Sequence, residues 1–177
     1  MTSFEKNMAV DKDKYKALYE YQKAQFDDEK TRYSKLEDKA TKYLTSLTIV
    51  ISAYILIVGK FIGASNTIFC LTYALIIFFI VLTFLSFCSA WFSIFNSLKL
   101  QEVKKMPSDH HLIEYFLDNE LPTIYWDLAE KYDEAIKWYR NKNHDKTVLM
   151  QQGYNEIIHS GIFFVISIFF IFLTKVV

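Results

Sequence analysis

Charged and apolar residues are segregated along the chain. Three stretches carry no Asp, Glu, Lys or Arg: residues 43–59, 61–98 and 157–174. A helix needs about 20 mostly apolar residues to cross a hydrocarbon core about 30 Å thick, and about 17 is the lower limit. The first and third stretches are therefore just long enough for one span each. The second is too long for one span, so we expect a turn at Gly63-Ala64-Ser65-Asn66 and a helix that continues past the membrane.

The charged segment before the first apolar stretch also has a helical pattern. Residues 11–42 contain no Gly or Pro, and a seam recurs at steps of three and four residues: Tyr19, Gln22, Phe26, Glu29, Tyr33, Leu36, Ala40, Tyr43 and Leu47. This spacing is close to a heptad repeat and runs into the first apolar stretch without a break. The sequence allows two partners for this seam: another helix of the same chain, or a helix of another copy.

The second charged segment predicts two more helices. Met106-Pro107-Ser108-Asp109 is predicted to end one helix and to supply the N-cap of the next, a short helix around 110–119. Pro122 then stands at the start of a longer helix, with an apolar stripe at Tyr125, Leu128, Tyr132, Ala135 and Tyr139. Gly153 is the only weak point of this helix before the third apolar stretch.

The predicted fold class is an all-α membrane protein with three transmembrane helices and a helical cytoplasmic domain. Residues 1–42 form a cytoplasmic N-terminal helix, and residues 43–98 form a transmembrane hairpin with spans at about 43–62 and 67–93. Residues 99–155 form a cytoplasmic helical segment, and 156–177 the third transmembrane helix. Because 18 of the 20 Lys and Arg residues lie in segments 1–42 and 99–155, we expect the N-terminus inside and the C-terminus outside.

The remaining composition gives little sign of an enzyme. The sequence contains no glycine-rich phosphate loop, nucleophile elbow or Cys/His metal spacing, so we expect no catalytic residue, cofactor or metal. His110 and His111 are adjacent and point about 100° apart on a helix, which disfavours a shared metal. Cys70 and Cys88 read as apolar fillers of the second stretch. His159 is either an interfacial or buried imidazole, or a proton sensor.

Small hydroxyl residues form stripes inside the apolar stretches. The second stretch carries Thr72, Thr83, Ser86, Ser89, Ser93 and Ser97 on one helix face. Two interpretations are open: helix packing, which small residues favour in membranes, or the lining of a pore. One chain has too few spans to enclose a channel, so a pore implies a homo-oligomer of about three to six copies. For the stripes Thr41, Thr45, Thr48, Ser52, Gly59 and Ser160, Ser167, Thr174 we expect packing.

A cationic turn precedes the third apolar stretch. Asn143 and Lys146 continue the stripe of the long helix where an apolar residue would be expected, and Arg140 and Lys142 lie beside them. One interpretation is the basic flank of a span, which is attracted to anionic lipid. The other is a binding site for an anionic ligand such as a nucleotide, since Arg, Lys and amide donors suit phosphate.

Two segments resemble a known class of proteins. The run RYSKLEDKATKYL, at the entry to the hairpin, is similar to the SLATT-type effectors of bacterial anti-phage systems. The run YDEAIKWYRNKNHDKTVLMQQ, before the last span, resembles other small effectors of that class, including the Hailong membrane effectors. The resemblance implies a homo-oligomeric assembly in the bacterial inner membrane. It also implies gating by a nucleotide or oligonucleotide that a partner nucleotidyltransferase or cyclase makes.

Pattern and resemblance together predict an oligomeric effector that opens an ion-conducting pore and depolarises the cell during phage infection. Its partners would be the lipid bilayer, further copies of itself and the nucleotide signal. Two alternatives are a non-conducting membrane anchor that recruits a cytoplasmic enzyme, and a holin-like pore former.

Overall fold

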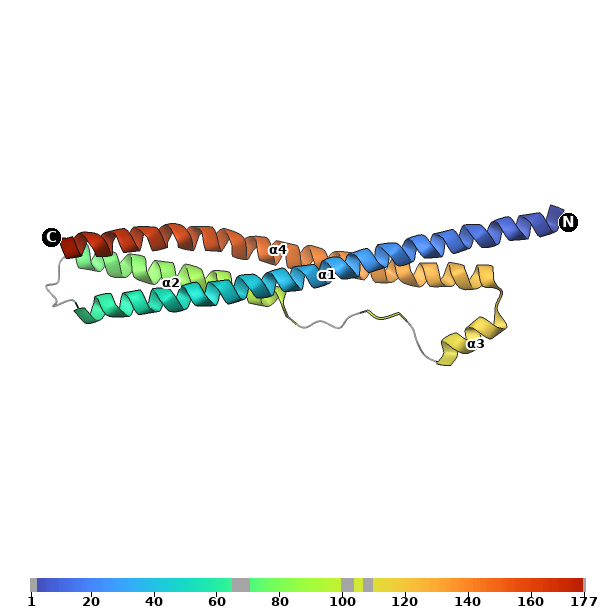
Figure 1. The fold of residues 1–177 in the computed structure, drawn as a ribbon, viewed down its shortest axis with the longest axis horizontal. Helices are drawn as coiled ribbons and strands as arrows, with labels where there is room; N and C mark the ends of the chain where they lie inside the picture. The colour runs from blue at the N-terminus through green and yellow to red at the C-terminus, as the bar shows by residue number, and fades with distance from the viewer. Residues whose placement is uncertain (1–2, 65–70, 100–103, 107–109, 177) are drawn as a thin grey trace. The chain divides into compact units, whose positions relative to one another are not determined.

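The computed structural model describes residues 3–64, 71–99, 104–106 and 110–176. Within these ranges the chain forms four α-helices: α1 (Ser3–Ala64), α2 (Leu71–Ser97), α3 (His110–Asp118) and α4 (Leu121–Val176) (Figure 1). The predicted all-α fold is confirmed. The chain divides into two compact units, the first made of residues 1–36 and 100–144 and the second of residues 37–99 and 145–177.

Helix boundaries agree with the sequence pattern where they can be compared. Helix α1 continues into the first apolar stretch without interruption, and Gly153 does not break α4. Helix α2 extends past residue 93 to Ser97, and α3 covers the predicted short helix. Of the predicted turn, Gly63 and Ala64 are the last residues of α1, and Ser65 and Asn66 lie outside the described residues. The predicted N-cap at Pro107-Ser108-Asp109 also lies outside them.

A repeat of seven residues defines the buried face of α1. Phe26, Tyr33, Ala40, Leu47, Tyr54 and Phe61 are all buried. Between them the prediction placed Tyr43 in the seam, but Tyr43 is exposed and its neighbour Leu44 is half-buried instead. The positions of the seven-residue repeat stay buried, but the half-buried contacts between them move from three residues after a repeat position (Glu29, Leu36) to four residues after it (Leu44, Ile51, Val58). Seven residues fall short of two full turns of a straight helix, and this drift moves the lateral contacts by one residue.

The core of the first unit is aromatic and joins α1 to α4. Phe26 and Tyr33 pack against Ala135, Ile136 and Tyr139. The ring centroids of Phe26 and Tyr33 lie 5.5 and 5.6 Å from that of Tyr139, in edge-to-face geometry. Tyr132 packs beside this core, and its pKa is raised to about 12. Burial is the larger cause, and the interaction with the neighbouring Tyr19 is the next. The α1 seam therefore packs within the chain, as the first of the two open interpretations proposed.

Helix α3 belongs to the first unit and is joined to α4 by a hydrogen bond. The Tyr115 hydroxyl donates a hydrogen bond to the Asp127 carboxylate of α4, and this bond raises the pKa of Tyr115. None of the residues of α3 is buried. His110 and His111 are exposed, each within 4 Å of the Glu114 carboxylate. Among the described residues no group of three or more His, Cys, Asp and Glu side chains is arranged to hold a metal ion.

The second unit packs α2 and the later parts of α1 and α4 against one another (Figure 1). Phe61, Ile76, Ile80 and Ile171 form its apolar cluster. Near the middle of this bundle the buried Tyr54 hydroxyl is 3.3 Å from the Ser167 hydroxyl and donates to the Ile80 carbonyl oxygen at 3.5 Å. One side chain thus links all three helices and satisfies polar groups that lipid would leave unpaired.

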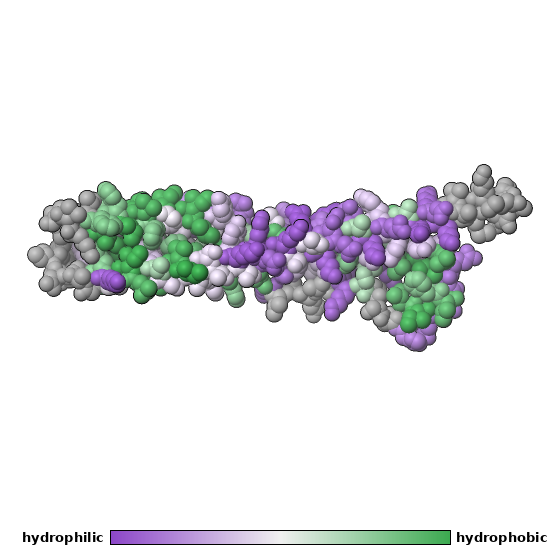
Figure 2. Space-filling view, viewed as in Figure 1, coloured by the Kyte–Doolittle hydropathy of each residue, from purple (hydrophilic) through white to green (hydrophobic). Residues whose placement is uncertain are grey.

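The outer surface of the second unit is apolar. Large hydrophobic side chains are exposed on each of its helices, among them Ile49, Leu56, Phe78, Phe92, Val165 and Phe172. Figure 2 shows this apolar surface over α2 and the adjoining parts of α1 and α4. Three helices, within Lys12–Ile62, Tyr73–Ser97 and Leu121–Phe172, are long and apolar enough to cross a membrane. Exposed apolar surface of this extent indicates association with a membrane.

Gly153 allows α4 to approach α2 closely. A Cβ at this position would lie 2.6 Å from Ile94 Cγ1 and 3.4 Å from the Ala90 carbonyl oxygen, whereas a Cβ at Gly161 would meet nothing within 4 Å. Membrane helices use small residues at such contacts. Gly153 therefore has no room for a side chain, whereas Gly161 on the same helix does and can serve as its control.

We expect Gly161→Ala to stabilise the protein and Gly153→Ala to be less stable than Gly161→Ala. Both changes favour the helix by about 1 kcal/mol, but the collision at Gly153 costs about 1–3 kcal/mol. Thermal unfolding in detergent, followed by circular dichroism, measures the difference. Equal midpoints for the two variants would show that α2 and α4 are not in close contact at Gly153.

Candidate functional site

The six hydroxyl residues predicted to line a pore do not share one environment. Thr83 and Ser97 are 0% and 3% exposed, on the face of α2 that packs inside the chain. Their hydroxyls donate to the carbonyl oxygens of Phe79 and Ile94 on the same helix. These two residues follow the packing interpretation. The side chain of Thr72 lies outside the described residues.

Ser86, Ser89 and Ser93 lie beside that packed face. Ser89 is exposed, and Ser86 and Ser93 are half-buried. Steps of three and four residues place the three on one side of α2. The pore-lining prediction therefore narrows to these three serines.

The structure adds a carboxylate to this group that the pattern did not single out. The Ser86 hydroxyl lies 3.4 Å from the backbone oxygen and 3.5 Å from the carboxylate Oε2 of Glu156 on α4. Both distances are at the long end of the range for hydrogen bonds. Glu156 directly precedes the third charge-free stretch, so the sequence places it at a membrane boundary. Its pairing with Ser86 depends on the register of α2 against α4, which no local pattern reveals.

The hydroxyl stripes of α1 and α4 also differ in their exposure. Ser160 and Ser167 are buried, and packing accounts for them as predicted. Thr41, Thr45, Thr48 and Ser52 are exposed, and the Trp91 indole of α2 donates a hydrogen bond to the Thr48 hydroxyl at 3.3 Å. Packing within the chain accounts for Thr48, and for the other three residues packing stays a prediction. Each of the four donates its hydroxyl proton to the carbonyl oxygen four residues earlier, so the exposed stripe leaves no donor unsatisfied.

In the first unit, two residues of the cationic turn meet the same carboxylate. Arg140 Nε donates to Glu29 Oε1 at 3.3 Å, and Asn143 Nδ2 donates to Glu29 Oε2 at 2.8 Å. The Asn143 amide also donates to the Glu29 backbone oxygen at 3.0 Å. Asn143 is buried, so its position in the seam reflects a polar pair inside the core rather than a solvated face.

Lys146 belongs to the second unit and has different partners. Its ammonium donates to Glu37 Oε1 at 2.9 Å and to the Ser97 carbonyl oxygen at 2.9 Å. The Ser97 carbonyl is at the last turn of α2, where backbone oxygens lack intrahelical partners and cations are favoured. Although its side chain is 4% exposed, Lys146 thus has a carboxylate and a helix terminus to stabilise its charge.

These contacts change the chemistry expected of the turn. Arg140, Asn143 and Lys146 already bind carboxylate or carbonyl oxygens, and Lys142 is half-buried. An anionic ligand would have to replace Glu29 on Arg140 and Asn143, or Glu37 on Lys146. The sequence contained a sign of the first pairing, because Glu29 and Asn143 are polar residues in the seams of two helices.

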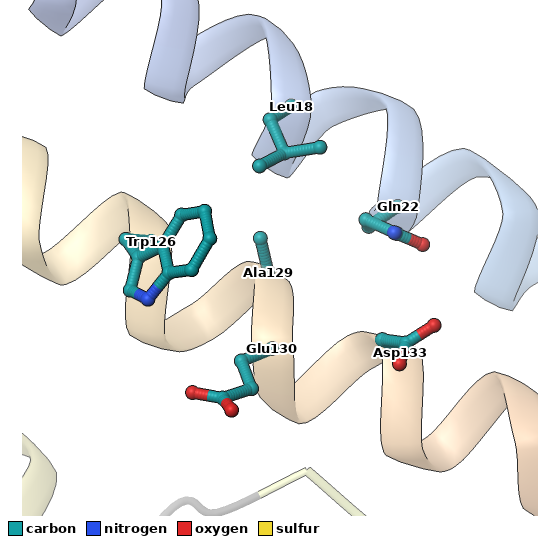
Figure 3. Close-up of a pocket in the computed structure, with 6 residues that line it drawn as sticks. All are labelled: Leu18, Gln22, Trp126, Ala129, Glu130 and Asp133. Carbon is teal, nitrogen blue, oxygen red and sulfur yellow. The ribbon is translucent and has the colours of Figure 1, made fainter.

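The first unit also has a groove between α1 and α4, of about 280 Å³. Figure 3 shows Leu18 and Gln22 on one side and Trp126, Ala129, Glu130 and Asp133 on the other. The floor is apolar, and two carboxylates lie at the edge. Carboxylates repel phosphate at neutral pH, so this groove does not replace the cationic turn as the candidate site for a nucleotide.

The Lys146 contacts predict a stability difference between two lysines. Lys146→Met removes the cation shared by Glu37 and the end of α2, and we expect a loss of about 1–3 kcal/mol in the free energy of unfolding. Lys39→Met, at an exposed position of α1, should change it by less than about 0.5 kcal/mol. Denaturant unfolding of the purified proteins measures both. If the two variants unfold alike, the Lys146 contacts do not stabilise the fold.

Comparison of the chain with protein-family models, with curated proteins and with solved structures finds no match.

Proposed function

We propose that the protein is an oligomeric membrane effector whose copies enclose a gated ion-conducting pore. One observation carries the proposal: Ser86, Ser89 and Ser93 form a hydroxyl row on an otherwise apolar helix, beside the face that packs inside the chain. Ser89 is exposed, so packing within the chain does not explain a polar residue at this position. Hydroxyl groups in an apolar span hydrogen-bond to other helices or to water in a pore.

The membrane arrangement follows from charge and length. The excess of Lys and Arg in segments 1–42 and 99–155 favours a cytoplasmic N-terminus and an external C-terminus, with three spans. Three helices of one chain are too few to enclose a channel. A pore therefore requires about three to six copies around a common axis.

The biological role extends the resemblance to SLATT-type effectors. In this role the protein resides in the bacterial inner membrane and depolarises the cell during phage infection. A nucleotide-derived signal would bind at Arg140, Lys142, Asn143 and Lys146. Phosphate oxygens would then replace the Glu29 carboxylate on Arg140 and Asn143, which frees Glu29 from α4. A charge exchange of this kind is a common way for a ligand to bias a conformational equilibrium.

A membrane anchor is the second candidate, and α3 supports it. Ile113, Phe116 and Leu117 are exposed on this short helix, with Leu117 at 81%. Figure 2 shows an apolar patch over α3 and the start of α4. Exposed apolar side chains outside the spans are typical of a surface that binds a partner. A scaffold that recruits an enzyme would use such a surface and would conduct no ions.

Ion flux through liposomes that contain the purified protein separates the two candidates. The pore proposal expects flux from the wild type, and a several-fold loss with Ser89→Leu or Ser93→Leu at unchanged oligomer mass. Ser52→Leu, on the exposed face of α1, is the matched control and should conduct like the wild type. A monomer that releases no ions would instead support the anchor.

A further inference from the structure

Glu156 has a special place in the charge distribution of the chain. It is the only Asp, Glu, Lys or Arg between Lys146 and Lys175, and residues 43–59 and 61–98 have none. A charged residue inside a span is costly, and it usually faces a water-filled cavity or a polar partner. Whether Glu156 is inside the apolar region or at its edge is decided by what it contacts.

Its contact with Ser86 places the carboxylate well inside. Ser86 belongs to the candidate span Tyr73–Ser97. At 1.5 Å per residue it lies about 10 Å from residue 93, the predicted inner end of the span. It is also five residues, or about 7.5 Å, beyond Trp91, whose ring suits an interface. Glu156 reaches this depth because α4 runs beside α2 and its carboxylate lies 3.5 Å from the Ser86 hydroxyl.

Two polar rows meet at this contact. On α2 the row is Ser86, Ser89 and Ser93, and on α4 it is Gln152, Glu156 and His159, which share a face by their spacing of four and three residues. Gln152, Ser89 and His159 are exposed, and Glu156 is half-buried. Around them the surface of the second unit carries large apolar side chains such as Leu85 and Phe92. The polar strip is thus a local feature of one side of the bundle.

We propose that Glu156 makes the pore cation-selective, an inference that rests on the pore proposed above. Copies arranged around an axis would place one Glu156 each beside the serine row, and this forms a ring of carboxylates. Rings of Asp or Glu side chains favour cations and repel anions in channels. Serine hydroxyls alone would hydrate ions of either sign. Glu156 would therefore give the pore lining a selectivity for cations that the serines alone do not provide.

A reaction rate at Ser89→Cys tests the inference without requiring an open pore. Cys70 and Cys88 are first replaced by Ser, and Ser89→Cys is treated at pH 8 with a cationic and with an anionic methanethiosulfonate reagent. Rates are divided by those of a small thiol in solution. One carboxylate about 6 Å away in water-like surroundings enriches a cation and depletes an anion about threefold each.

We expect the ratio of cationic to anionic rates to fall about tenfold when Glu156→Gln is added. Asp145→Asn, an exposed carboxylate on the same helix, is the matched control and should leave the ratio unchanged. A ratio that is the same with and without Glu156 would overturn the inference and leave the pore intact. No reaction at Ser89→Cys with either reagent would overturn the pore lining as well.

A second measurement uses the conducting protein. In a planar bilayer with a KCl gradient, the wild type should give a reversal potential near that of K⁺, and Glu156→Gln should move it towards zero. Glu156→Lys should move it towards that of Cl⁻. A reversal potential that follows Cl⁻ in the wild type would contradict the inference even though the protein conducts.

Discussion

A buried seam that repeats every seven residues holds each unit together. In α1 it consists of large or small apolar residues at a constant spacing, and in α4 it continues through Tyr139, Asn143, Lys146, Met150 and Gly153. Where the seam is polar, each polar group described above has a partner on another helix or on its own. Glu29 pairs with Asn143, and Glu37 with Lys146. Polar pairs in a heptad seam fix the register, because a shifted register leaves them buried and unpaired.

The position of a hydroxyl relative to the seam separates packing from other roles. Thr83, Ser97, Ser160 and Ser167 lie on the seam, where small size permits close approach and the helix's own carbonyls accept the proton. Ser86 and Ser89 lie beside the seam, next to the one carboxylate of the apolar region. Ser86 contacts Glu156 of the same chain, but packing inside the chain does not account for the exposed Ser89. The proposed pore and its cation selectivity both depend on this difference between the packed face of α2 and the serines beside it.

Local pattern predicts most of the fold and only part of the site. Charge-free stretches and helical periodicity gave the helices, the unbroken entry of α1 into its apolar part and the start of α4 near Pro122, because these depend on neighbours along the chain. Tyr43 was misplaced because the contacts between the seven-residue positions shift by one residue along α1. The contact between Ser86 and Glu156 joins residues 70 positions apart. It depends on the register of two helices, so a stripe on α2 alone does not reveal it.

The most direct test of this account is whether the polar strip lies within a chain that crosses the membrane three times. Single cysteines at Tyr21, Lys60 and Lys175, in a chain with Cys70→Ser and Cys88→Ser, can be labelled in spheroplasts with a membrane-impermeant maleimide. The account predicts that Lys60→Cys and Lys175→Cys react from outside, and that Tyr21→Cys reacts only after the membrane is permeabilised. Protection of Lys175→Cys until permeabilisation would place the C-terminus inside, remove the third span and contradict the account.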